Sequence, residues 1–280
     1  MTETLSFEPF QVKHLAGAMR MSANVGWPHR IEDWAFVAGL SKGVVAQQGD
    51  EVVATALATP FGQVAMVNLI IVDAAMRGRG LGRDIMCRAL DTVTPTAWQL
   101  VATQDGLPLY EKLGFETIGE IVQHQGLVVP ADTEPERDEC IGWATADDIT
   151  DLLAMDYAAT GMDRATLYAA LVAEAQFAVL RQSGRITGFA AVRPFGRGEV
   201  AGPVIAQNVE DAQSLLSAIM ASRAGQFLRV DTGADSGLSE WLTTRGLVHA
   251  GGGLQMQKGE HAAPPASPYS VFGLASQALG

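Results

Sequence analysis

The sequence predicts a mixed α/β (α+β) fold of two tandem domains, each a mixed, mostly antiparallel twisted sheet flanked by helices. Short apolar runs bounded by turn residues predict strands, and stretches with apolar residues at helical spacing predict helices. Gly49-Asp50 and Ser183-Gly184 lie between neighbouring strands as tight turns, which indicates antiparallel pairing. After a charged, proline-containing stretch at 130–139 the order of elements repeats weakly.

The elements of the first half follow from these patterns. After residue 80, Leu81, Ile85 and Ala89 recur every four residues and give a helix with one buried face. Gly114 follows a short helix as a C′ glycine. The expected helices are 12–25, 31–40, 83–91 and 107–113, and the expected strands are 5–10, 43–47, 52–58, 63–72, 98–103, 115–123 and 126–129.

The second half has the same kinds of pattern. We expect domains at 1–129 and 140–280, joined by a linker at 130–139. The stretch 261–268 is expected to be irregular, and 269–279 is apolar enough to pack on a domain or a partner. The expected helices are 149–157, 164–174, 209–223 and 238–245, and the expected strands are 176–181, 186–193, 198–205, 227–230 and 254–257.

The composition excludes several classes of protein. A net charge of −12 argues against nucleic-acid binding. No apolar run approaches the roughly 20 residues of a membrane span, and Met1-Thr2-Glu3-Thr4 does not begin a secretory signal. Cys87 and Cys140 lie far apart, which suits reduced thiols in the cytoplasm and neither a disulfide framework nor a metal site.

The most informative stretch is Arg77-Gly78-Arg79-Gly80-Leu81-Gly82, between the apolar run 69–72 and a helix. The first amides of a helix have no partners within it and carry partial positive charge. Glycines let a diphosphate approach that backbone closely. Strand, glycine turn and helix start together predict an anion site.

Four interpretations of this turn can be compared. A Walker A loop is excluded because Gly82 is followed by Arg83-Asp84 and not by lysine and Ser/Thr. A dinucleotide fingerprint has the spacing G-x-G-x-x-G and opens a βαβ unit, whereas here the spacing is G-x-G-x-G after several strands. A ligand-free turn remains open, but two arginines beside three glycines argue against it.

The fourth interpretation is a resemblance to a family. Ile70-Ile71-Val72-Asp73 followed by residues 77–83 resembles the acetyl-CoA-binding motif of the GNAT family of N-acetyltransferases, a strand followed by R/Q-x-x-G-x-G/A at a helix start. Downstream, Leu109-Tyr110-Glu111-Lys112-Leu113-Gly114-Phe115 resembles the second signature, a tyrosine-bearing helix that ends in Gly-Phe. The resemblance covers about residues 3–128. Ala74 and Thr103 depart from it where many members have proline and asparagine, but neither change removes a phosphate contact.

The resemblance implies an enzyme that transfers the acetyl group of acetyl-CoA to a primary amine of a small molecule or peptide, by direct attack in a ternary complex. The amides of Gly78 to Arg83 would hold the pyrophosphate, and the amide of about Ile71 or Val72 would stabilise the oxyanion. Tyr110 would protonate the departing thiolate. The implied cofactor-binding residues are Ile70, Ile71, Val72, Arg77, Gly78, Arg79, Gly80, Leu81, Gly82 and Arg83.

Other features remain open at this point. Trp27, His29, Glu32 and Trp34 are candidates for the amine pocket, although surface or core packing explains each of them better. In the second half the corresponding turn, Ala206 to Asp211, has no glycine and carries two carboxylates, so it resembles a degenerate GNAT-like domain with no second cofactor site. That half would complete the amine pocket, form a homodimer or cover the sheet edge. The alternative function is a non-catalytic acyl-CoA sensor, which needs no general acid.

Overall fold

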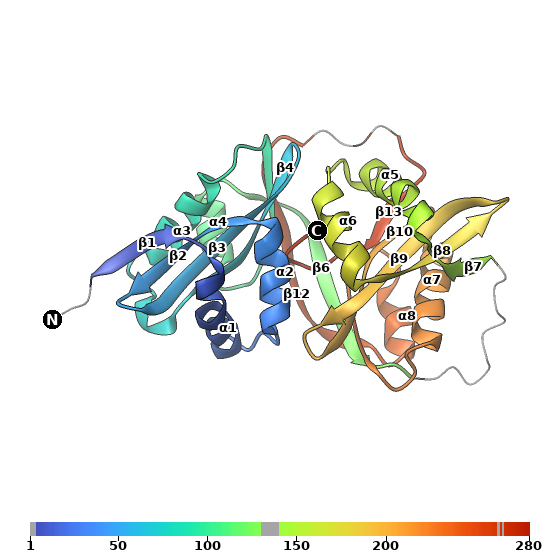
Figure 1. Ribbon diagram of the computed structural model, residues 1–280, viewed down its shortest axis with the longest axis horizontal. Helices are drawn as coiled ribbons and strands as arrows, with labels where there is room; N and C mark the ends of the chain where they lie inside the picture. The colour runs from blue at the N-terminus through green and yellow to red at the C-terminus, as the bar shows by residue number, and fades with distance from the viewer. Residues whose placement is uncertain (1–3, 130–139, 262–263, 265) are drawn as a thin grey trace.

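The computed structural model describes residues 4–129, 140–261, 264 and 266–280, and it shows two halves side by side (Figure 1). The predicted linker at 130–139 lies outside the described residues. The N-terminal half contains the strands β1 (Leu5–Pro9), β2 (Lys42–Gln48), β3 (Glu51–Phe61), β4 (Val64–Val72), β5 (Ala97–Ala102) and β6 (Glu116–Leu127). Its helices are α1 (Leu15–Asn24), α2 (Ile31–Leu40), α3 (Leu81–Leu90) and α4 (Leu107–Lys112).

The C-terminal half has the same order of elements. Its helices are α5 (Ile149–Thr160), α6 (Ala165–Glu174), α7 (Val209–Ala221) and α8 (Ser239–Thr244). Its strands are β7 (Ile141–Trp143), β8 (Gln176–Gln182), β9 (Arg185–Phe195), β10 (Gly198–Ala206), β11 (Phe227–Gly233), β12 (Val248–Gly259) and β13 (Ser270–Gly273). The α/β class and the mostly antiparallel pairing predicted from the sequence are confirmed, since among the described strands only β4–β5 and β10–β11 pair in parallel.

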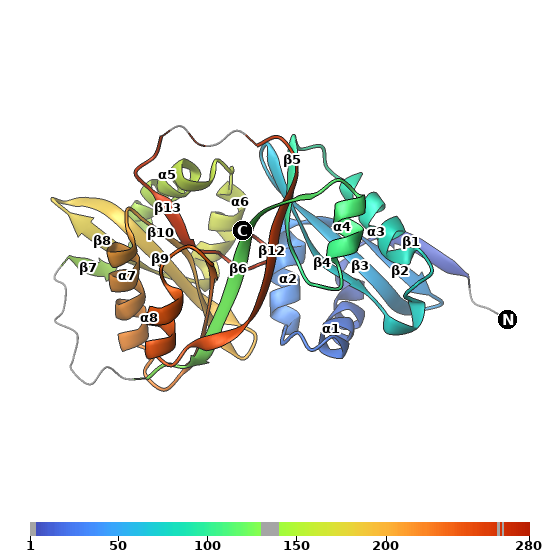
Figure 2. The same cartoon turned by 180° about the vertical axis from the view of Figure 1, so that it is seen from behind.

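The two halves exchange a strand. Along the continuous sheet the order is β1-β2-β3-β4-β5-β12-β6-β11-β10-β9-β8-β7, so β12 lies between β5 and β6, and β6 pairs with β11. Figure 2 shows β12 and β6 side by side at the centre of the molecule. The sheet is therefore shared across the boundary that the sequence suggested between the domains.

Glycines explain two boundaries that the sequence placed wrongly. The expected break between strands 115–123 and 126–129 does not occur, because Gly126 lies in a continuous β6 and gives room for the Gly246 carbonyl. The expected closing strand 254–257 is longer and begins at Val248. Its Gly252 and Gly253 approach the carbonyls of Ile121 and Ala102 too closely for any side chain.

Helices cover both faces of the sheet. The largest core joins α1 and α2 to α5 and α6 across the two halves, with Trp34, Tyr168 and Leu279 among its buried residues. On the other face, α3 packs on β2, β3 and β4, and α7 and α8 pack on the C-terminal strands. The apolar tail is confirmed to pack on the protein, because Leu274, Ala275 and Leu279 are buried.

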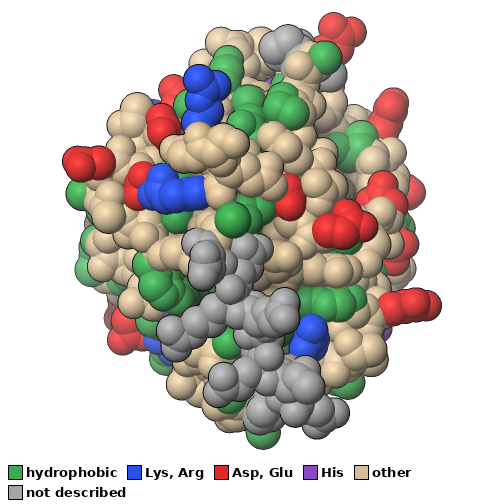
Figure 3. Space-filling view, turned by 90° about the vertical axis from the view of Figure 1, so that its right-hand side faces the viewer, with side chains coloured by type: hydrophobic (Ala, Val, Ile, Leu, Met, Phe, Trp, Pro, Cys, Tyr) green, Lys and Arg blue, Asp and Glu red, His purple; other side chains and the backbone are tan. Residues whose placement is uncertain are grey.

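Charged side chains are spread over the surface of the C-terminal half. Figure 3 shows the end formed by the C-terminal half, where acidic and basic side chains lie scattered among uncharged ones. In the part of the chain that the structure describes, no helix is both long and apolar enough to cross a membrane.

Candidate active site

The glycine turn lies between β4 and α3. Asp73 opens it by accepting the Ala75 amide at 2.8 Å, and a 3-10 turn over Ala74–Met76 follows. Gly78 and Gly80 then take left-handed backbone angles, with φ of +75° and +83°. A side chain is strained at such angles, so glycine is what lets the chain turn here and enter α3 at Leu81.

The turn presents a row of free amides. Within the described part of the chain, the amides of residues 78–82 donate to no protein acceptor. The Arg83 amide, which was expected to bind the pyrophosphate as well, instead donates to the Gly80 carbonyl at 3.0 Å. Consecutive free amides at a helix N-terminus form a site for an anion such as a phosphate.

The three arginines of the turn differ in position. Arg77 donates from Nε to the Val72 carbonyl at 3.3 Å, and its Nη1 lies 3.6 Å from the exposed carboxylate of Asp105. Arg79 donates to the Met76 sulfur at 3.9 Å, and Arg83 is exposed on α3. Arg77 lines the cavity that runs from this turn along β4, whereas Arg79 and Arg83 do not.

Beyond the turn, β4 and β5 diverge. Among the described residues they pair only at 64–66 with 97–99, so the rest of β4 has a free edge on this side. Leu69 has φ +48° at a bulge, and Thr55 Oγ1 donates to its carbonyl at 2.7 Å. Ile71 lies opposite Thr55, and the Asp73 amide donates to the Val53 carbonyl of β3. Because amide directions alternate along a strand, the Ile71 amide also faces β3, whereas the amides of Ile70 and Val72 face the free edge.

Two cavities lie along this edge. The first, of about 640 Å³, runs from the glycine turn along β4, and the second, of about 370 Å³, lies between the two halves. The predicted cofactor residues that line the first are Ile70, Ile71, Val72, Arg77, Gly78, Gly80, Leu81 and Gly82. Four residues line both cavities, namely Trp27, Ile70, Thr103 and Tyr110.

Tyr110 therefore lies where the two cavities meet. It is in α4, its ring contacts Phe115 edge-on at 6.2 Å between centroids, and only 6% of the residue is exposed. Burial raises the pKa of the phenol to about 12, because the charged phenolate is poorly solvated there. The hydroxyl is consequently protonated at neutral pH.

The predicted amine-pocket residues do not all lie together. Trp27, His29 and Trp34 line the second cavity. The hydroxyl of Ser22 contacts both His29 and Trp34. It lies 3.2 Å from His29 Nδ1 and accepts from Trp34 Nε1 at 2.9 Å. Glu32 is exposed on the first turn of α2 and lines neither cavity, whereas the neighbouring Asp33 lines the second.

His29 is electrically neutral in this environment. Desolvation by burial lowers its pKa to about 4, with a smaller contribution from the positive charge of Arg229, while Asp33 acts in the opposite direction. Asp33 itself is engaged, since it pairs with Arg30 at 2.7 Å and accepts the Gly196 amide at 3.0 Å.

The C-terminal half supplies the opposite wall of the second cavity, which the sequence did not reveal residue by residue. Phe195, Arg197 and Arg229 come from β9, the turn after it and β11. The tail contributes Ser276 to Ala278, and Gln277 donates to the buried Asp231 at 2.8 Å. The only sequence signal for this wall was the apolar character of the tail.

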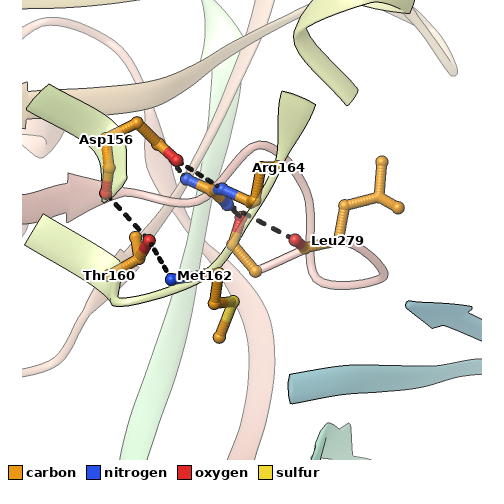
Figure 4. Close-up of polar contacts among 6 residues, drawn as sticks. Asp156, Thr160, Met162, Arg164 and Leu279 are labelled. Atoms are coloured by element: carbon orange, nitrogen blue, oxygen red, sulfur yellow. Dashed lines mark hydrogen bonds and ion pairs between the residues drawn. The ribbon is translucent and has the colours of Figure 1, made fainter. Parts of the chain in front are cut away.

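A buried ion pair anchors the tail (Figure 4). Asp156 and Arg164 are both fully buried and bind each other through two hydrogen bonds. The remaining nitrogen, Nη1 of Arg164, donates to the carbonyls of Gly280 at 2.6 Å and Leu279 at 3.4 Å. From the N-terminal half, Asn68 donates to the Ala278 carbonyl at 2.8 Å, so the tail is fixed to both halves.

Among its described residues, the C-terminal half has no equivalent of the open edge. There β10 and β11 also pair only briefly, at Glu199–Val200 with Leu228–Arg229, but β13 lies along the last residues of β10. Leu274 donates its amide to Asp231 of β11 at 2.8 Å, so the tail bridges the two strands. At the start of α7 the Asn208 side chain already accepts the Asp211 amide, beside two carboxylates.

Comparisons with known proteins point to one family. Models described as Acetyltransferase (GNAT) domain match residues 40–117 and residues 152–273. The uncharacterized N-acetyltransferase YitH of Bacillus subtilis (strain 168) is 29% identical over 225 residues, which cover 78% of this chain and 79% of that protein.

Solved structures share the fold. A putative acetyltransferase from Pyrococcus horikoshii has a TM-score of 0.83 at 17% identity, over 100% of this chain and 97% of its own. A tandem GNAT protein from the clavulanic acid biosynthesis pathway has a TM-score of 0.64 at 15% identity, over 94% and 100%. The chain therefore belongs to the GNAT acetyltransferase family and carries two of its domains in tandem.

Proposed function

We propose that the N-terminal half binds acetyl-CoA and transfers its acetyl group to a primary amine, by direct attack in a ternary complex. The observation that carries this proposal is the continuity of the two cavities. Free amides stand at one end of the first cavity, a free strand edge runs along it, and a buried phenol stands where it meets the second.

The residues present fit such a cofactor. The amides of residues 78–82 would hold the pyrophosphate, and the dipole of α3 would add roughly 1 kcal/mol. The outward amide of Val72 would hydrogen-bond the pantetheine arm as if it were an added strand. Side chains play little part in either contact, which explains why ordinary apolar residues serve along β4.

Two groups would act on the reacting atoms. The Ile70 amide faces the free edge and Ile70 lines both cavities, so we assign it to the developing oxyanion in preference to Ile71, whose amide faces β3. Tyr110 would donate its proton to the departing thiolate. Because burial raises the pKa of Tyr110, the phenol still holds this proton at neutral pH when the thiolate leaves.

The proton of the amine would leave to water. Alkylamines have a pKa near 10, and His29, with a pKa of about 4, is far too weak a base to remove such a proton. Asp33 is occupied by Arg30 and Gly196. His29 is accordingly assigned as a wall of the amine pocket and not as the general base.

The test is thiol release from acetyl-CoA with a panel of primary amines, using the wild-type chain and Tyr110→Phe. The variant keeps the ring, so acetyl-CoA affinity should stay within about twofold while kcat falls by about 10²- to 10⁴-fold. Unchanged turnover in the variant would disprove the acid assignment. Acetyl-CoA binding without turnover of any amine would favour the alternative, a non-catalytic acyl-CoA sensor.

A further inference from the structure

The second cavity has a cationic wall. Arg197 follows β9 and lines the cavity, and it forms no ion pair with any residue that the structure describes. Arg229 lines the same wall and is 9% exposed. It donates from Nε and Nη2 to Asp231, both at 2.9 Å, while Nη1 donates to no acceptor among the described residues.

The charges at this cavity sum to a positive excess, to which the buried Arg193 beside Phe195 contributes. Asp33 is neutralised by Arg30 and Arg229 is neutralised by Asp231, so both pairs cancel. Arg197 remains as an uncompensated cation. Two guanidinium groups with spare N–H donors match a group with two oxygens and a single negative charge, which is a carboxylate.

We propose that the acceptor is a primary amine that also carries a carboxylate, as an amino acid does, and that Arg197 and Arg229 bind this carboxylate. This inference rests on the proposed acetyltransferase function. Neither arginine lines the first cavity, so the carboxylate would lie on the side of the second cavity away from the reacting thioester. The amine then points toward Ile70 and Tyr110, which line both cavities.

Size and electrostatics agree with such an acceptor. A cavity of about 370 Å³ is near the small end of ligand sites, and it lies between Trp27 and Phe195, which would contact an apolar side chain. The positive charge of Arg229 also acts across the cavity, because it contributes to the lowered pKa of His29.

The test compares L-amino acids with their carboxamides and with the amines left after loss of the carboxylate. With rates corrected for the fraction of neutral amine, the amino acids should have kcat/KM about 10- to 100-fold higher. Arg197→Gln should raise KM for the amino acids by about tenfold or more and leave the decarboxylated amines nearly unchanged. Arg197→Lys should recover part of the loss.

Arg185→Gln is the matched control, because Arg185 lies exposed at the other end of β9 and lines neither cavity. It should leave all three groups of substrates unaffected. Turnover of amines without any preference for the carboxylate overturns this inference and leaves the acetyltransferase proposal intact. Acetyl-CoA binding with no turnover across the whole panel overturns both.

Discussion

The ring of Tyr110 lies directly over the α-carbon of Gly106: a Cβ atom at position 106 would be 2.6 Å from Cε2 and 3.0 Å from the hydroxyl oxygen. Gly106 has an ordinary φ of −84°, so this glycine is required for space and not for backbone conformation. The contact fixes the phenol at the junction of the two cavities. It makes Gly106 a positioning residue for Tyr110.

Gly106→Ala should therefore displace the phenol and lower kcat toward the level of Tyr110→Phe. Steady-state kinetics on the two single variants and the double variant check this. Because both changes remove the same proton donor, the double variant should lose little more than Tyr110→Phe alone. Fully additive losses would show that Gly106 acts by another route.

Gly80→Ala should weaken acetyl-CoA binding by at least about tenfold, since the new methyl group enters the space before the free amides. Gly184→Ala is the control, because both glycines have left-handed φ, +83° and +78°, with no atom within 4 Å of the added Cβ. Both variants then bear the same backbone strain of about 1–2 kcal/mol. Calorimetry should show weaker binding for Gly80→Ala alone, and an equal loss in both would argue against the cradle.

Acid should destabilise the protein through His29. Its pKa is about 4 in the fold and 6.5 in the unfolded chain, so the unfolded state binds more protons between these values. The free energy of unfolding therefore falls as pH drops through this window, by about 3 kcal/mol at most. Urea titrations at pH 7 and near pH 4 should show a smaller fall for His29→Gln than for wild type, and equal falls would contradict the assignment.

Arg164→Met should cost about 3–5 kcal/mol of unfolding free energy, because it leaves the Asp156 carboxylate buried and unpaired. It should also loosen the tail and raise KM for the amine more than it weakens acetyl-CoA binding, since the tail lines only the second cavity. Adding Asp156→Asn should restore part of the stability. Thermal denaturation and kinetics measure the two effects, and an unchanged KM in a folded variant would remove the tail from the amine pocket.

Local pattern predicted much of the fold. Helix periodicity located α3, and hairpin turns located β2–β3 and β8–β9. The sequence did not predict the strand exchange, because β12 contains Gly251-Gly252-Gly253, which reads as a loop. Gly252 and Gly253 are explained by carbonyls of β6 and β5, from strands distant in the chain.

Only part of the candidate site could likewise be predicted from local sequence patterns. The glycine turn and Tyr110 form local patterns, and eight of the predicted cofactor residues line the first cavity together with Tyr110. The second cavity is assembled from both halves, and Arg197, Arg229 and Gln277 come from three separate segments. No spacing in the sequence links these residues, because only the strand exchange and the anchored tail bring them together.

Calorimetric titration of the intact chain with acetyl-CoA tests the central claim most directly. The N-terminal half offers free amides and an open strand edge, whereas β13 and Asn208 occupy the equivalent positions in the C-terminal half. The titration should give one bound molecule per chain, and Gly80→Ala should weaken that single binding event. Two bound molecules per chain, or none at high micromolar acetyl-CoA, would contradict the account.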